Sequence, residues 1–172
     1  MTFWHDNIIT EFDLICENED KIALSDISFF VGKLSSGFLG FFLDRFPRKG
    51  TWIVTQFFCT IFTGLQVTAG TIEIYSGYRF LQGVCDQLLY QTMYNYAIEL
   101  IEPQNRSRYV PYIDMMCGVA GCILAIIGVL TQTWKEYTIS ISVIMAISTV
   151  LICFMPESSK WLQEKGLSFR RF

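Results

Sequence analysis

The chain is short of charge and nearly without histidine, and both shortages exclude classes of protein. Charged residues make up 17% of its 172 residues, against about 25% in an ordinary soluble domain. With a formal net charge of −3, the chain offers no basic surface to a nucleic acid. The single histidine, His5, leaves little scope for a catalytic triad or a metal centre. We therefore expect neither an enzyme nor a cofactor or metal site.

Apolar residues stand where charge is missing. They amount to 52% of the chain, and aromatic residues alone to 16%. Charges are rare or absent in five stretches, each long enough to cross a ~30 Å hydrocarbon layer as a helix. These stretches are residues 25–42, 51–72, 74–98, 109–134 and 137–155. The sequence therefore predicts an all-α membrane protein with five transmembrane helices, a lipid bilayer as its surroundings, and short connections.

The basic residues predict how the chain is oriented. If residues 1–21 lie outside, the connections alternate so that nine lysines and arginines fall inside and two outside. Such a bias is typical of cytoplasmic segments. We expect an integral membrane protein with an extracellular tail (residues 1–21), a five-helix transmembrane bundle (residues 22–155) and the start of a cytoplasmic loop (residues 156–172). The N-terminus is then outside and the C-terminus cytoplasmic.

Four segments, in order, resemble one known family. They are TEFDLIC at residues 10–16, GFFLDRFPRK at residues 40–49, RFLQG at residues 79–83 followed by Glu99-x6-Arg106, and PESSKWL at residues 156–162. Together they resemble the organic cation/anion/carnitine transporter family, a solute carrier family of the major facilitator superfamily. The chain departs from the family pattern at Pro47, where a glycine is usual, and at Ser159 and Lys160, where Pro-Arg is usual.

The resemblance implies a fold and a function. The five spans would correspond to helices two to six of a twelve-helix fold, a partial N-terminal helix bundle without the first helix and the second half. The implied function is transport of small organic ions across the plasma membrane by alternating access, with cations favoured over anions or zwitterions. The missing half-bundle or a homo-oligomer would supply the second wall of the path. The alternative is a non-transporting membrane protein that associates with other transporter subunits, and a pore is a third interpretation.

Polar residues inside the spans are the candidates for substrate binding, because a charge in the bilayer usually faces a cavity or a partner. Asp86 falls near the middle of the span at residues 74–98. Gln82 and Arg79 lie one and two turns to one side of it, and Tyr90 and Tyr94 one and two turns to the other. This stripe predicts ligand contacts through charge and aromatic faces. The resemblance adds weight to Tyr90 and Tyr94, since the family's ligand-contacting aromatics follow the RFLQG motif. The alternative is interhelical hydrogen bonding that only holds the bundle together.

Lys33 lies at a similar depth on a neighbouring span that we expect to pack antiparallel. A pair between Lys33 and Asp86 would be lost or exchanged when a ligand binds. The alternative for Lys33 is that it reaches toward the membrane surface.

A second set of charges gathers at the predicted inner face, where Pro103 should end a helix before Arg106. We expect these residues to form ion pairs that hold the inside closed: Asp44, Arg45, Arg48, Glu99, Arg106 and Glu157. The alternative is that they are ordinary flanking charges that fix the topology.

Overall fold

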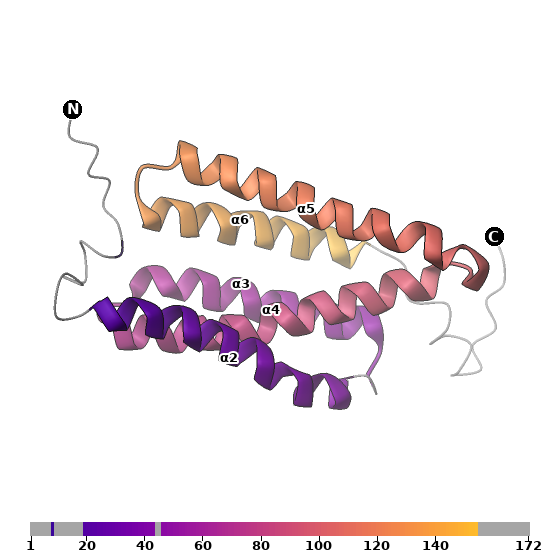
Figure 1. The fold of residues 1–172 in the computed structure, drawn as a ribbon, viewed down its shortest axis with the longest axis horizontal. Coiled ribbons are helices and arrows are strands. Elements are labelled where there is room, and N and C mark those ends of the chain that lie inside the picture. Colours follow the sequence, from indigo (N-terminus) through magenta and orange to yellow (C-terminus); the bar gives the residue numbers. More distant parts are fainter. Residues whose placement is uncertain (1–7, 9–18, 44–45, 155–172) are drawn as a thin grey trace.

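The computed structural model describes residue 8 and residues 19–43 and 46–154. These residues form the five long helices that the sequence predicts, with no strand among them (Figure 1). The helices are α2 (Glu19–Leu43), α3 (Arg48–Leu65), α4 (Ile72–Leu100), α5 (Arg106–Leu130) and α6 (Trp134–Cys153). Short 3-10 turns, η2 (Gln66–Thr68) and η3 (Pro103–Asn105), follow α3 and precede α5. Nearly all of the predicted tail and all of the predicted C-terminal loop lie outside the described residues.

Successive helices run in opposite directions, so α2 and α4 run parallel (Figure 1). The prediction that Lys33 lies on an antiparallel neighbour of the helix bearing Asp86 was therefore wrong, because α3 intervenes between the two in the chain. Helix α4 makes its largest contacts with α2 and the next largest with α3, and α3 also packs against α6. Helix α5 contacts α4 and α6 only slightly.

The beginnings of α4 and α6 are defined by threonine caps and by a small aromatic cluster. The Thr71 hydroxyl accepts a hydrogen bond from the Ile74 amide, and Thr133 and Glu136 form a reciprocal capping box. Such caps satisfy amides that the helix itself leaves unpaired. Close by, the Tyr75 and Trp134 rings pack edge to face with centroids 5.8 Å apart. Together these contacts hold the starts of α4 and α6 at one end of the bundle.

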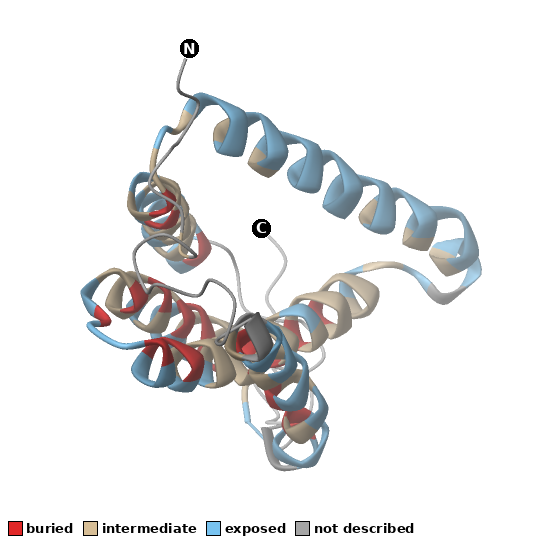
Figure 2. Cartoon of the chain, turned by 60° about the vertical axis from the view of Figure 1, so that its left-hand side comes forward, coloured by how far each residue is buried: buried red, intermediate tan, exposed pale blue. Residues whose placement is uncertain are grey.

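Several buried positions of the bundle hold polar residues, and many large apolar residues are exposed, unlike the usual pattern of a water-soluble protein. Ser36 and Thr63 are 0% and 2% exposed, whereas Leu34 and Val129 are 78% and 86% exposed. Several buried hydroxyls donate to carbonyls of their own helices; Thr55 donates to Thr51 at 2.7 Å and Thr63 to Cys59 at 2.8 Å. Pale-blue exposed residues cover the outer faces of the helices in Figure 2. A surface of this kind suits hydrocarbon, where backbone and side-chain polar groups must be paired internally.

Among the described residues, only α5 and α6 are long and apolar enough to cross a membrane by length and composition alone. Helices α3 and α4 carry more polar side chains, but several of these are buried between helices rather than exposed. Gln56 in α3 and Gln66 in the adjoining turn η2 are 4% and 3% exposed. The five predicted spans therefore divide into an apolar pair and a group whose polar residues are used in helix packing.

Candidate functional site

The contact between α2 and α4, called the seam below, brings two backbones together at glycines. A Cβ atom built on Gly32 would overlap the carbonyl oxygen of Phe80, and one built on Gly83 would overlap the carbonyl oxygen of Phe29. Only glycine allows so close an approach. The two helices thus cross with almost no space between them at this level, and the polar side chains lie on either side of the crossing.

Two ion pairs join α2 to α4 across the seam. Asp26 Oδ1 lies 3.4 Å from Arg79 Nη2, and Lys33 Nζ lies 2.7 Å from Asp86 Oδ2. The two residues on each helix are seven apart, which is two turns, so they share a face. Because α2 carries an acid then a base and α4 a base then an acid, opposite charges meet at both levels. The predicted Lys33–Asp86 pair is present in the structure.

A phenylalanine ring lies between the two cations of the seam. The Phe29 ring centroid is 4.8 Å from Lys33 Nζ and 5.2 Å from Arg79 Cζ. Ring faces attract cations at such distances. Sequence reasoning missed both Phe29 and Asp26. The sequence does single out Asp26, because Asp26 and Lys33 are the two charged residues between positions 25 and 42 and lie two helical turns apart.

A groove of about 360 Å³ lies beyond this crossing, toward the ends of α2 and α4, and is called the Tyr90 groove. It is lined by Lys33, Leu34, Ser36, Gly37, Gln87, Tyr90, Gln91 and Tyr94. The Tyr90 and Tyr94 rings stack with centroids 6.1 Å apart and an interplanar angle of 19°. Tyr90 is 44% exposed. Three of the six predicted substrate-binding residues therefore line one cavity, and Asp86 is joined to it through Lys33.

Two glycines of α2 shape this groove. At Gly37 a Cβ atom would meet no other atom within 4 Å, so the groove is open there. At Gly40 a Cβ atom would lie 2.6 Å from the Gln91 side-chain oxygen, so the Gln91 carboxamide packs directly on the α2 backbone. The Ser36 hydroxyl donates to the carbonyl of Lys33 at 2.6 Å, within its own helix. The groove is thus open beside Gly37 and closed by Gln91 at Gly40.

Gln82 lies outside this groove and faces α3. Its carboxamide oxygen accepts a hydrogen bond from Gln66 Nε2 at 2.7 Å, and its Nε2 donates to the Thr63 hydroxyl at 3.2 Å. These are the interhelical hydrogen bonds that the sequence left open as an alternative role for the polar stripe. Arg79 forms the other ion pair of the seam, with Asp26. The stripe on α4 therefore divides between two neighbouring helices.

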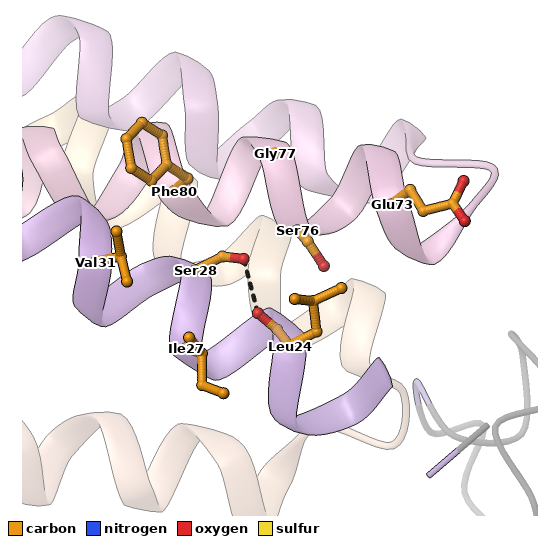
Figure 3. Close-up of a pocket in the computed structure, with 8 residues that line it drawn as sticks. All are labelled: Leu24, Ile27, Ser28, Val31, Glu73, Ser76, Gly77 and Phe80. Carbon is orange, nitrogen blue, oxygen red and sulfur yellow. Dashed lines mark hydrogen bonds between the residues drawn. The ribbon is translucent and has the colours of Figure 1, made fainter. Parts of the chain in front are cut away.

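A second groove, of about 400 Å³, lies where α2 and α4 begin, and is called the Phe80 groove (Figure 3). Its lining is Leu24, Ile27, Ser28, Val31, Glu73, Ser76, Gly77 and Phe80. The Ser28 hydroxyl donates to the carbonyl of Leu24 at 2.7 Å, drawn as the dashed line. None of the predicted site residues lines this groove.

The predicted closing charges are described only in part. Asp44, Arg45 and Glu157 lie outside the described residues, as does the side chain of Arg48. Helix α4 ends at Leu100 before Pro103, as predicted, with Glu99 in its last turn. Arg106 begins α5, and its Nε is buried without a hydrogen bond to any described residue.

Lys49, which we had not assigned to the closing charges, makes a contact at this end of the bundle. Its Nζ donates to the carbonyl of Cys153 at 3.0 Å. A cation at the end of a helix pairs with carbonyls that have no partner within that helix. Lys49 therefore ties the beginning of α3 to the end of α6.

Comparisons with known proteins agree with the resemblance seen in the motifs. The chain matches the family described as "Sugar (and other) transporter" over residues 7–168. It is 25% identical to organic cation transporter 1 of Caenorhabditis elegans, with 94% of this chain and 28% of the relative covered. It is 28% identical to solute carrier family 22 member 3 of Mus musculus (92% and 29% covered) and 27% identical to organic cation/carnitine transporter 2 of the same species (92% and 29%).

The chain thus spans less than a third of the length of these relatives. The family match, in contrast, covers nearly all of this chain, and the five helices fit a partial helix bundle of the kind that the motifs imply. With its buried polar residues and exposed apolar faces, this is an integral membrane protein that belongs to the sugar (and other) transporter family of the major facilitator superfamily.

Proposed function

We propose that the chain lines the substrate path of an organic-ion transporter that works by alternating access, with cations favoured over anions or zwitterions. The observation that carries this proposal is the Tyr90 groove, in which two stacked tyrosines lie beside the Lys33–Asp86 pair. The names of the relatives, organic cation transporter and organic cation/carnitine transporter, support the substrate class.

The groove suits a small organic cation on chemical grounds. Tyrosine faces attract cations, and the attraction grows as water is excluded. Asp86 supplies a negative charge one turn from Tyr90, and its side chain is 41% exposed. A cation bound between these groups would keep contact with both charge and ring surface, so it would not have to be transferred bare into hydrocarbon.

Alternating access needs a second wall that moves against this one. A second helical half, or a second copy of this chain, would supply it. We place the chain in the plasma membrane with its N-terminus outside and its C-terminus cytoplasmic, following the distribution of basic residues. The charges in and beside the connections that follow α2, α4 and α6 would then close the inner side: Asp44, Arg45, Arg48, Glu99, Arg106 and Glu157. The Lys49 contact with Cys153 supports an ordered arrangement at that end.

A chimera tests the proposal. The matching segment of the mouse solute carrier family 22 member 3 would be replaced by this chain, and uptake of radiolabelled tetraethylammonium measured in cells. We expect saturable uptake that Tyr90→Ala lowers about tenfold, since one cation–ring contact contributes ~0.5–2 kcal/mol. Tyr112→Ala is the matched control, because Tyr112 is an exposed tyrosine of α5 whose ring pairs with Tyr109 away from the groove.

Equal uptake by the Tyr90→Ala chimera and its parent, at equal surface expression, would exclude the groove from the path. The chain expressed alone should show no saturable uptake, because it provides one wall of the cavity. Saturable uptake by the chain alone that Tyr90→Ala abolishes would overturn the requirement for a second wall. If the chimera is inactive and the chain binds to complete carriers instead, the non-transporting alternative is the better interpretation.

A further inference from the structure

Lys33 already occupies the position that a cationic substrate would seek. Its ammonium lies 2.7 Å from the Asp86 carboxylate and 4.8 Å from the centre of the Phe29 ring. A carboxylate and an aromatic face are also the two features that attract an organic cation. Among the described residues that line the Tyr90 groove, Lys33 is the only charged one. The Lys33 side chain therefore already occupies the place beside Asp86 and Phe29 where a cationic substrate would bind.

We infer that Lys33 is a specificity-determining residue: a tethered cation that competes with cationic substrates for Asp86. The inference rests on the proposed function and deepens it, because it says how the groove selects by charge. While the pair is intact, the two charges cancel and a cation meets no free carboxylate. When only a small fraction of the protein is in the state that can bind a ligand, the apparent affinity for that ligand is reduced by that fraction. Lys33 thus sets the affinity for cations, not only the shape of the groove.

The pair is placed so that it can open. The Lys33 and Asp86 side chains are 32% and 41% exposed, so neither is sealed into the seam. The lysine side chain is a flexible stem that ends in three donors. The groove also presents the carboxamides of Gln87 and Gln91, whose oxygens can accept a hydrogen bond from the released ammonium. Displacement by a cation therefore need not leave an unpaired charge.

Removal of either partner should change the preference of the groove in opposite directions. Without Lys33, the Asp86 carboxylate is free and attracts cations. Without the Asp86 charge, the Lys33 ammonium is free and attracts anions. A pair that only held α2 to α4 would behave differently, because loss of either partner would then weaken every ligand alike.

The experiment measures dye binding to the full chain in lipid nanodiscs. The cationic probe is a fluorescent styryl-N-methylpyridinium, and the anionic probe is carboxyfluorescein. Lys33→Met should bind the pyridinium about tenfold more tightly than the parent chain, as expected if the pair is closed about nine-tenths of the time. Asp86→Asn should bind the pyridinium about tenfold more weakly and gain affinity for carboxyfluorescein. The double variant should lose both preferences.

Lys33→Arg keeps the experiment decisive if Lys33→Met folds poorly. Arginine pairs with a carboxylate through two parallel hydrogen bonds, so this variant should bind the cation more weakly than the parent. Circular dichroism of each variant reports whether the helices are intact. Equal or weaker pyridinium binding by folded Lys33→Met overturns the inference, and so does the lack of binding by both that variant and the parent chain. Failure of the proposed function is recognised separately: Tyr90→Ala would then leave transport by the chimera unchanged while the Lys33 variants still changed dye affinity.

Discussion

Helices α4 and α5 are of similar length and follow one another in the chain, yet they differ in almost every physical respect. Helix α4 carries Arg79, Gln82 and Asp86 within its span and makes large contacts with α2 and α3. Helix α5 carries no charged residue from Met115 to Leu130, and none of the residues of the helix, all of which are described, is buried. In Figure 2, α5 stands apart from the other helices and is largely exposed. The more polar helix is the better packed one.

Membrane chemistry explains this order. Lipid tails are as apolar as leucine, so apolar side chains alone do not drive helices together. Close backbone contact and interhelical hydrogen bonds do, and α4 has both at Gly83 and Gln82. Helix α5 contains glycines as well, but a Cβ atom at Gly118 or Gly121 would meet nothing within 4 Å. A small residue stabilises a contact only where another backbone is present.

The largest effect that we predict is at Gly83. Its replacement by alanine would force α4 away from the α2 backbone at Phe29, which also strains the ion pairs on either side. We expect a loss of about 3 kcal/mol in stability, the upper part of the range for overpacking. Reversible unfolding of the chain in mixed micelles, followed by circular dichroism, measures it.

Two matched glycines complete this test. A Cβ atom at Gly77 in α4 or at Gly121 in α5 would meet nothing within 4 Å. Their alanine variants should be neutral or up to ~1 kcal/mol more stable, because alanine is the better helix former. Equal loss of stability in all three variants would show that close packing of α2 on α4 is not what makes Gly83 sensitive to replacement.

The junction between the two helices gives the next prediction. Glu99 lies in the last turn of α4 and Arg106 begins α5, so a charge network here would couple the packed part of the bundle to the unpacked part. In the chimera, Glu99→Gln and Arg106→Ala should each favour the inward-open state by ~1–3 kcal/mol, the usual range of coupling energies. The double variant should change the equilibrium by less than the sum of the two.

Accessibility of cysteines introduced at the inner face to a thiol reagent measures this equilibrium. Strictly additive shifts would mean that Glu99 and Arg106 act independently, as ordinary topology charges do.

The sequence predicts the helices well, and motif by motif it predicts the family. Runs without charge and the position of Pro103 depend on local chemistry, which is why five helices and the end of α4 could be foreseen. The parallel direction of α2 and α4 could also have been foreseen, because one other span lies between them in the chain. Which helices become neighbours could not, because that depends on packing between distant segments. The pairing of Lys33 with Asp86 was foreseen because opposite charges at one depth in a bilayer have few other partners.

The division of the α4 stripe was harder to foresee. Residues three and four apart share a helix face, so Gln82 and Asp86 appear equivalent in sequence. In the structure Gln82 bonds to Gln66 on one neighbour and Asp86 to Lys33 on another. The spacing of residues places them on a face, but it does not say where one neighbouring helix ends and the next begins.

Gln82 provides a smaller test of the same division. Gln82→Ala removes two hydrogen bonds from α4, one to Thr63 in α3 and one to Gln66 in the adjoining turn η2. Gln66 and Thr63 keep bonds to the carbonyls of Phe62 and Cys59. We expect a loss of ~0.6–1.7 kcal/mol, the range found for such bonds between membrane helices. The unfolding assay measures it, and dye binding in the Tyr90 groove should be unchanged.

Ser140→Ala in α6 is the control for Gln82→Ala. Its hydroxyl donates to the carbonyl of Glu136 within the same helix, so the loss should be within ~0.5 kcal/mol. A large loss of dye affinity in Gln82→Ala would place that residue in the binding site rather than in the packing of α3.

The last prediction is that Asn105 carries no glycan, and it tests the orientation of the whole bundle in the membrane. A glycosylation sequon, Asn105-Arg106-Ser107, begins at the residue before α5, and Asn105 is exposed. The orientation that we propose from the basic residues would put this connection on the cytoplasmic side, away from the glycosylation machinery, so we expect endoglycosidase to cause no mass shift.

Cysteine labelling tests the same orientation without relying on glycan attachment. Asn105→Cys should react with a membrane-impermeant maleimide only after cells are permeabilised, whereas Lys135→Cys, in the first turn of α6, should react in intact cells. The reverse pattern would invert the bundle and move the closing charges to the outer face, although the contacts between α2 and α4 would stay as they are.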